Sequence, residues 1–508
     1  MEGKQMKKED LLESRTRQDL AFIQYLYTHN GHALRKQMAT DLQVDPRLIT
    51  DHMAALGDQL NTLFPNAPFH LGPSETEYIL DLVNLPTLED ITNLLIREGY
   101  SFQILAYIFW HNEFTMSGLQ RALLMSSSTL FRHVSRLNTL LAEFNIAIRN
   151  NRLMGRELDI RHFYYQLFIV LNGHDPRLSD TSNRAIERFI TLFQQRITGP
   201  LDENIQQAIR VYLHIVLQRV ASNHPLNDSV GVFKLNTLIK LPKVREMQQI
   251  WEEMFGRNHH IAIEFESVAF FVYTFYARIL PLKSDLYRQL YLGTSSFSIK
   301  MRGYVHTVMD ILSSKFEMHS YHEEFQLIFF TELTTIALLP GVITTAHQLI
   351  YTAMQGVYWK PESGQMRFIR YIIAQLQKNS EDFSQPGAVD ELEERLLMTV
   401  LLLLRHTHRQ FQIGLLTSND LPINFYLLRA LKEQIGANFN IHIENFDRHH
   451  QYDIILTTSM ELAAQLGLKN DLPLIQLQDF GTSSDFVVLY WYLDTLVSNY
   501  LKTDLVLS

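Results

Sequence analysis

The sequence predicts a mainly α-helical protein of several domains, on three observations. Its 508 residues exceed what one hydrophobic core holds, so three to five domains of roughly 100 to 150 residues are expected. Apolar residues recur every three or four positions through most of residues 16–408, which indicates amphipathic helices. Only residues 409–508 alternate strand-like and helix-like runs, as in a small α/β domain.

Residues 1–85 predict a first helix-turn-helix unit. One amphipathic helix over residues 16–30 stops at Asn30 and Gly31, a second follows, and Asp45 and Pro46 open a third. The exposed face of the third helix is predicted to carry four polar residues: Arg47, Thr50, Asp51 and His52. Arg47 and Thr50 are therefore candidates for DNA contact, although the carboxylates on this helix weaken it as a phosphate binder. A helical bundle that only packs remains an alternative.

Residues 86–162 predict a second helix-turn-helix unit, which we expect to supply most of the DNA contact. Ser126 is a good N-cap for a helix whose buried stripe is formed by Leu130, Val134, Leu137 and Leu141. The other side is expected to face outward with groups that suit phosphates and base edges. That side comprises Ser127, Ser128, Thr129, Phe131, Arg132, His133, Ser135 and Arg136. Its DNA-binding candidates are Ser127, Ser128, Thr129, Arg132, His133 and Arg136.

A β-hairpin is predicted directly after this helix. Ile146 and Ile148 alternate as in a strand, the two asparagines at 150 and 151 favour a tight turn, and the apolar alternation then resumes. Arg149 and Arg152 fall at the tip. A wing with arginines at its tip would reach a phosphate or the minor groove, which adds positioning rather than sequence reading.

Charge and cysteine content limit the classes of protein that fit. The net charge of −9 alone argues against nucleic-acid binding, but residues 101–156 are locally basic. Their charged residues are Arg121, Arg132, Arg136, Arg149, Arg152 and Arg156 against Glu113 and Glu143. The absence of cysteine excludes disulfides, cysteine-ligated zinc and thiol catalysis.

The sequence predicts a cytoplasmic protein without a membrane span. The first residues are polar and charged with no apolar stretch behind them, unlike a secretory signal. The longest apolar run, residues 396–404, is about half of the ~18 residues that a span requires.

The middle of the chain is predicted to be helical nearly throughout. Polar breaks divide it into two all-helical subdomains, at residues 163–285 and 286–408, and His214 and His306 each lie in an amphipathic helix of one of them. The expected organisation is thus 1–85, 86–162, 163–285, 286–408 and 409–508.

This order of domains resembles that of the Mga/AtxA group of virulence regulators. Local similarities are Ser128-Thr129-Leu130-Phe131-Arg132, the pair Leu137-Asn138, and the run from Ile160 to Tyr165. The resemblance covers nearly the full length. It implies that residues 163–408 form two PTS regulation domains and that residues 409–508 form an EIIB-like domain.

The resemblance also implies a function. Such a protein would be a cytoplasmic activator that forms a homodimer or a larger oligomer, binds double-stranded promoter DNA and acts on RNA polymerase. It would be tuned by histidine phosphorylation from the sugar phosphotransferase system, with HPr as donor, and the candidates are His214, His306 and His406. Two departures oppose a full phosphorelay: Tyr273 stands where a second histidine would follow Glu266, and the loop 417–420 has no cysteine. We therefore expect the end domain to serve self-association.

Other readings of the same residues were weighed. Each candidate histidine is equally compatible with simple packing in a helix. No histidine pair shows the spacing and carboxylate of a zinc hydrolase, and neither a phosphate-binding glycine loop nor a catalytic triad stands out, so no metal, cofactor or enzymatic activity is expected. An RNA-binding antiterminator with paired regulation domains is the alternative function, disfavoured because those proteins begin with a β-rich RNA domain.

Overall fold

The computed structural model describes most of the chain. The described residues are 6–29, 31–63, 72–73, 77–80, 87–111, 114–171, 178, 183–226, 238–257, 261–277, 279–315, 322–338, 363–384, 386–407, 410–417, 421–436, 439–468, 473–477 and 483–503. They belong to two compact units, with the division at Leu280 and Pro281. The division lies close to the predicted boundary at residue 285. The finer domain boundaries stay a prediction.

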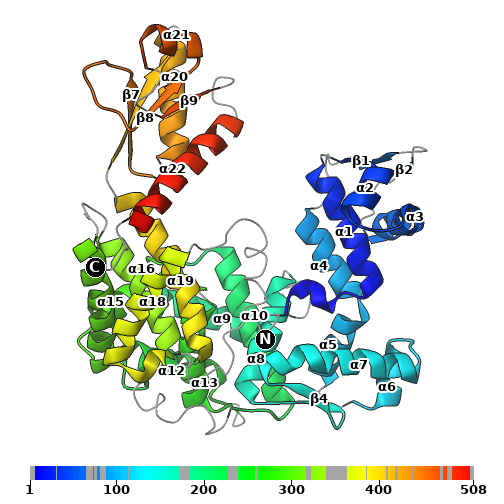
Figure 1. Cartoon of the computed structure of the whole chain (residues 1–508). Coiled ribbons are helices and arrows are strands. Elements are labelled where there is room, and N and C mark those ends of the chain that lie inside the picture. Colours follow the sequence, from blue (N-terminus) through cyan, green and yellow to red (C-terminus); the bar gives the residue numbers. More distant parts are fainter. Residues whose placement is uncertain are drawn as a thin grey trace. The chain divides into compact units, whose positions relative to one another are not determined.

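The first unit begins with a helix-turn-helix region (Figure 1). It contains η1 (Lys8–Leu11), α1 (Ser14–Thr28), β1 (His32–Leu34), α2 (Arg35–Asp41), α3 (Pro46–Leu63), β2 (Gly72–Pro73) and β3 (Glu77–Ile79). The predicted start of the third helix at Pro46 is confirmed. The antiparallel sheet of order β1-β3-β2 was not predicted, because its strands are only two or three residues long.

A second helix-turn-helix region follows, and its helices begin where their side chains can cap them. The elements are α4 (Leu88–Glu98), α5 (Tyr100–His111), α6 (Met116–Ala122), α7 (Ser127–Leu141), η2 (Ala142–Phe144), β4 (Ala147–Arg149), β5 (Arg152–Met154) and α8 (Glu157–Val170). Thr87 and Asp90 form a capping box at the start of α4, Thr115 caps α6, and Ser126 caps α7.

The rest of the first unit is a helical block with an aromatic core. It consists of α9 (Arg184–Phe193), η3 (Gln194–Thr198), α10 (Glu203–Ala221), α12 (Pro242–Phe255) and α13 (Ile263–Tyr276). Trp251 and Phe270 are fully buried, and their rings lie within 5.5 Å of the ring of Phe189. The aromatic run in α13 thus forms the core of this block.

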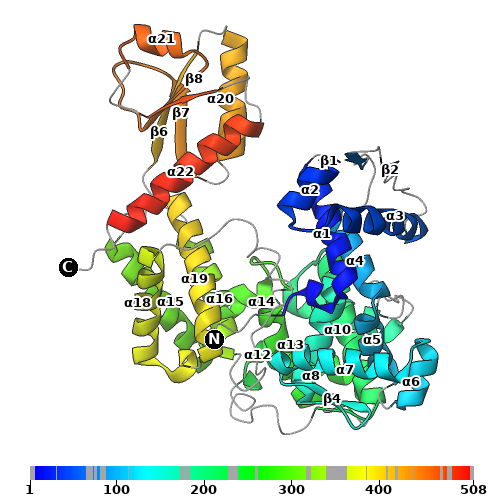
Figure 2. The ribbon, with the colours of Figure 1, turned by 45° about the vertical axis from the view of Figure 1, so that its right-hand side comes forward.

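The second unit combines a helical bundle with a small parallel sheet (Figure 2). The bundle contains α14 (Asp285–Leu292), α15 (Ser296–Lys315), α16 (His322–Leu338), α18 (Ser363–Asn379), η4 (Glu381–Phe383) and α19 (Pro386–Thr407). The sheet region contains β6 (Phe411–Leu416), α20 (Leu421–Ile435), β7 (Ile441–Asn445), β8 (Ile454–Thr457), α21 (Met460–Gln465), β9 (Leu474–Gln476) and α22 (Ser483–Thr503).

The order of this sheet is β7-β6-β8-β9, and all of its pairings are parallel. Crossover helices α20 and α21 connect its strands, as parallel pairing requires. The alternation predicted for the last hundred residues is therefore confirmed, and so is the mainly helical fold class. Within the described ranges, no helix is long and apolar enough to cross a membrane.

Candidate nucleic-acid interface

Helix α7 is fixed at its start by the hydroxyl of Ser126. This hydroxyl accepts a hydrogen bond from the backbone N–H of Thr129 at 3.2 Å and lies 3.0 Å from the hydroxyl of Ser128. Leu124, in the turn before α7, takes the left-handed conformation with φ of 52°. Behind this turn, Leu130, Leu137 and Leu141 are fully buried, as the periodicity predicted.

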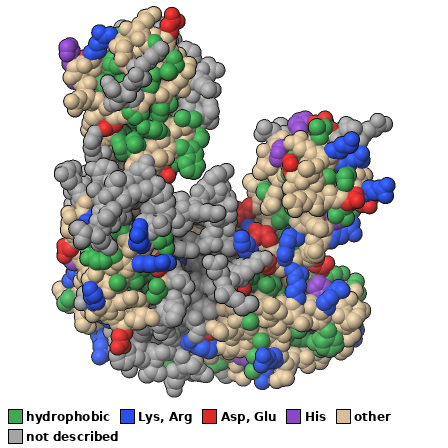
Figure 3. Space-filling view, in the orientation of Figure 1, with side chains coloured by type: hydrophobic (Ala, Val, Ile, Leu, Met, Phe, Trp, Pro, Cys, Tyr) green, Lys and Arg blue, Asp and Glu red, His purple; other side chains and the backbone are tan. Residues whose placement is uncertain are grey.

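The opposite face of α7 is open to solvent and carries short polar side chains with one guanidinium and one phenyl ring. Its exposed residues are Ser127, Ser128, Phe131, Arg132 and Ser135, and Thr129 is half-buried. The outward orientation predicted for these residues is confirmed. In the space-filling view, Lys and Arg side chains are scattered over the surface of the first unit, with Asp and Glu side chains between them (Figure 3).

His133 does not belong to the exposed face, so that part of the prediction is wrong. Its side chain is only 6% exposed, because positions 130, 133 and 137 follow the three-and-four spacing of the buried stripe. Its Nε2 atom lies 3.6 Å from a carboxylate oxygen of Glu13, and Tyr100 packs edge-on against its ring. Burial lowers the pKa of His133, Glu13 opposes this, and Arg132 and Arg136 lower the pKa further.

This burial predicts a pH dependence for the first unit. Because the pKa of His133 is lower in the folded chain than its ordinary value of 6.5, protonation favours unfolding. The contribution of His133 is complete above pH 6.5 and is lost as the pH falls below that value. We expect the His133→Gln variant to lose part of the acid destabilisation seen in thermal unfolding between about pH 5 and 7. Burial also lowers the pKa of His224, but this residue is present in both proteins and does not account for a difference between them. Identical pH profiles for variant and wild type would therefore contradict a role of His133.

Arg136 is also not free for DNA, contrary to prediction. Its guanidinium is half-buried and donates hydrogen bonds to the backbone carbonyls of Asp10 and Leu12. Burial lowers the pKa of Arg136, and Arg17 lowers it further. Arg136 therefore holds the N-terminal segment against α7.

This N-terminal segment, residues 6–12, connects the two helix-turn-helix regions. The backbone N–H of Met6 donates to a carboxylate oxygen of Glu143 at 2.7 Å. The ammonium of Lys8 donates to Glu89 and Asn93 on α4, both at 3.1 Å. Leu11 and Leu12 are each 1% exposed. The polar and charged residues of this segment gave no sequence signal for this structural role.

The predicted wing is confirmed. Strands β4 and β5 pair antiparallel, with Arg149 opposite Arg152. Asn150 and Asn151 have φ of 51° and 59°, the left-handed values of a two-residue type I′ turn. Both arginines at the tip are exposed. The tip is anchored because the backbone N–H of Phe114, just before α6, donates to the carbonyl of Asn151 at 3.2 Å.

Asn138 attaches the wing to α7. Its side-chain amide donates to the carbonyl of Ile148 at 3.2 Å and accepts from the N–H of the same residue at 2.6 Å. It thereby satisfies the edge of β4 that β5 does not cover. The sequence offered only the similarity of Leu137-Asn138 as a signal.

We expect the Asn138→Ala variant to loosen the wing. The N–H and C=O of Ile148 would lose their partner in a half-buried position, at a cost of about 1–3 kcal/mol. Hydrogen exchange in residues 146–154 should accelerate. In the Thr139→Ala variant, which truncates an exposed neighbour, exchange should not change. Equal exchange in both variants would count against the role of Asn138.

Comparison with known proteins agrees with this geometry. The family of Mga helix-turn-helix domains matches residues 86–168, the region that carries α4 to α8. A protein of Streptococcus pneumoniae serotype 4, described as a trans-acting regulator, is 19% identical over 324 residues, which are 62% of this chain and 63% of that protein. AcpB of Bacillus anthracis, a capsule synthesis positive regulator, is 19% identical over 434 residues, 80% of this chain and 84% of AcpB.

The chain is therefore similar to regulators of the Mga type, most directly in residues 86–168. It spans slightly less than two thirds of the length of the pneumococcal relative.

In the first helix-turn-helix region, the predicted contacts are only partly available. Arg47 is exposed, whereas Thr50 is half-buried and accepts a hydrogen bond from Tyr78 at 3.2 Å. The exposure predicted for His52 is wrong. It is buried and lies 2.6 Å from a carboxylate oxygen of Asp19, because it follows the buried Ile49 by three positions.

The three phosphorylation candidates differ in accessibility. His214 is half-buried in α10, and His306 is exposed in α15. His406 lies in α19, with its side chain outside the described part of the structure. Phosphorylation of any of them stays a prediction. Within the described residues, no group of three or more His, Asp or Glu side chains could hold a metal ion.

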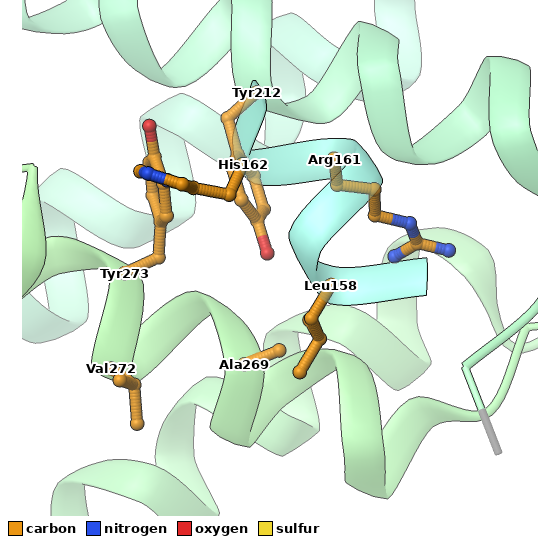
Figure 4. Close-up of a pocket in the computed structure, with 7 residues that line it drawn as sticks. All are labelled: Leu158, Arg161, His162, Tyr212, Ala269, Val272 and Tyr273. Atoms are coloured by element: carbon orange, nitrogen blue, oxygen red, sulfur yellow. The ribbon is translucent and has the colours of Figure 1, made fainter. Parts of the chain in front are cut away.

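Tyr273, at the position where the family resemblance predicts a second regulatory histidine, lies in the core of the first unit. It lines a small pocket with Leu158, Arg161, His162, Tyr212, Ala269 and Val272 (Figure 4). The ring of Tyr273 stacks on that of Tyr212 with centroids 4.3 Å apart. Burial raises the pKa of Tyr273 well above its ordinary value, so its hydroxyl is neutral.

A buried ion network lies beside this pocket. The guanidinium of Arg161 on α8 contacts both carboxylate oxygens of Glu266 on α13, at 2.9 and 2.7 Å. The carboxylate of Glu157 pairs with Arg161 at 2.8 Å and with Arg219 of α10 at 2.7 Å. Helix α8, which directly follows the wing, is therefore joined to the helical block by charge as well as by apolar packing.

Proposed function

We propose that this protein is a DNA-binding regulator of transcription whose second helix-turn-helix region makes most of the contact. The observation that carries the proposal is the combination of an open, polar α7 face with an arginine-tipped wing, inside the segment that matches the Mga helix-turn-helix domain. A helix of this kind fits the major groove, and the wing would contact the backbone beside it.

The local charge supports this proposal in spite of the net charge of −9. The sequence contains no Asp or Glu between Glu113 and Glu143. Within that stretch, Arg121 and Arg132 are exposed, and Arg149 and Arg152 follow on the wing. A surface with exposed guanidinium groups and no carboxylates attracts the phosphates of a duplex.

Further details of the proposed function are inferred from the described roles of the similar proteins. Because AcpB is described as a positive regulator, we propose activation rather than repression. We further propose binding to promoter DNA as a homodimer or a larger oligomer, action on RNA polymerase, and no enzymatic activity. Two-fold symmetric assembly would match the usual symmetry of operator sites.

Control by the sugar phosphotransferase system is a further part of the proposal, with HPr as phosphoryl donor. Exposed His306 is the more accessible candidate, while modification of half-buried His214 would disturb packing in α10. A phosphoryl group adds up to about two negative charges, which is enough to repel or re-pair neighbouring groups. Replacing either residue with Asp should change promoter output while the protein stays folded. An unchanged output in both variants would favour simple packing.

Duplex DNA of random sequence, titrated against the purified full-length protein over a series of salt concentrations, tests the main proposal. A hairpin RNA of equal charge serves as competitor. Tight binding to the duplex with a steep salt dependence is the expected result. Preference for the RNA would instead support the antiterminator alternative, and binding to neither would contradict both.

A further inference from the structure

The exposed face of α7 contains one large apolar side chain. Phe131 is 58% exposed, in a helix whose Leu130, Leu137 and Leu141 are buried and whose Val134 and Leu140 are half-buried. Its neighbours one turn before and one turn after are Ser127 and Ser135, and Arg132 follows it directly; all are exposed. The phenyl ring therefore projects beyond the short side chains around it and is covered by none of them.

We propose that Phe131 selects the DNA sequence by contacting the C5-methyl group of thymine in the major groove. This inference rests on the proposed function, because it concerns the same face of α7. In the major groove the thymine methyl is the apolar feature of the base edges, and phenylalanine is among the side chains that contact it. Arg132 is suited to hydrogen bonds with a phosphate or a guanine, whereas the phenyl ring offers only apolar contact.

The surroundings of Phe131 favour DNA as the occupant of this face. The side chains at positions 127, 128 and 135 are serines, which are short, so the backbone of α7 can approach the base edges closely. No carboxylate occurs in the sequence from residue 114 to residue 142, and the charged side chain among the exposed residues of this face is that of Arg132. The wing arginines, held beside α7 by Asn138, supply backbone contacts that would fix the register of the ring.

The test uses duplexes that differ by single methyl groups. The full-length wild-type protein first enriches a preferred site from random duplex DNA. Each thymine of that site is then replaced in turn with deoxyuridine, which lacks only the C5-methyl group. Because burying one methyl group is worth about 0.8 kcal/mol, the wild type should lose about fourfold in affinity at one or two positions.

The Phe131→Ala variant should bind the parent site more weakly and lose nothing further at those positions. The salt dependence of its affinity for random duplex DNA should equal that of the wild type. This equality would also show that the variant is folded. A matched control is Leu292→Ala, which truncates another exposed apolar residue in the second unit and should retain the deoxyuridine penalty.

Two results would overturn the inference while leaving the proposed function intact. One is duplex binding by the wild type with no deoxyuridine penalty at any position. The other is a penalty that persists unchanged in Phe131→Ala. Absence of any duplex binding by the wild type would overturn the proposed function and this inference together.

Discussion

Replacing Glu266 with alanine should destabilise the first unit by about 3–5 kcal/mol, the usual cost of leaving a buried charge without its partner. Glu266 is fully buried, and Arg161, at 2% side-chain exposure, contacts it with two hydrogen bonds. The arginine remains charged in the variant, and its remaining carboxylate partner among the described residues, Glu157, is shared with Arg219. Hydrogen exchange of amides in α8 and α13 would report the loss.

Two comparisons separate this effect from a simple loss of contacts. In the Glu253→Ala variant, which breaks the exposed pair with Arg196, the change should stay below about 1 kcal/mol. The double variant Arg161→Met, Glu266→Leu should be more stable than Glu266→Ala, because it removes both charges. A double variant less stable than the single one would contradict the argument.

Replacing Arg132, Arg149 and Arg152 together with alanine should have the largest effect on DNA binding. Each phosphate contact contributes about 0.9 to the slope of log affinity against log salt, so the slope should fall by about 2.7. At 0.15 M salt, this corresponds to about a 100-fold loss of affinity for random duplex DNA. Titration of labelled duplex at several salt concentrations measures both quantities.

A matched control removes the same charge from another surface of the same unit. Arg184, Arg188 and Arg257 are exposed on the helical block, and their triple alanine variant should keep the slope of the wild type. Equal losses in the two triple variants would indicate a general charge effect and would contradict the assignment of the interface. Arg136→Ala should act differently, through detachment of the N-terminal segment.

Local pattern was sufficient to predict the elements of the interface. Helix α7 has both a side-chain cap and a regular apolar stripe, and the wing has a two-asparagine turn between alternating residues. Each of these sequence signals lies within about ten residues of the helix or strand that it predicts. The alternating elements of residues 409–508 were predictable for the same reason.

Which polar side chains are buried was not predictable in the same way. Positions 133 and 134 both lie near the edge of the apolar stripe of α7. Because valine is apolar and histidine is polar, the sequence predicted that Val134 is buried and that His133 is exposed. The structure buries His133 because Glu13 and Tyr100 surround it, and both are distant in sequence. His52 is likewise buried by Asp19, and Arg136 is occupied by the backbone of Asp10 and Leu12. Helical spacing allows these polar residues to lie at the edge of the buried stripe, and tertiary contacts determine that they are buried there.

The N-terminal segment gives the spacing of a DNA target a structural origin. Residues 6–12 bind α4 and α7 and lead directly into α1, so the distance between α3 and α7 is set by packed contacts and not by a loose tether. If α3 and α7 both bind one duplex, the two DNA subsites that they contact must be separated by a fixed distance and a fixed angle around the helix axis of the DNA. Inserting five base pairs between the subsites, half a helical turn, would then turn one of them to the far side of the DNA.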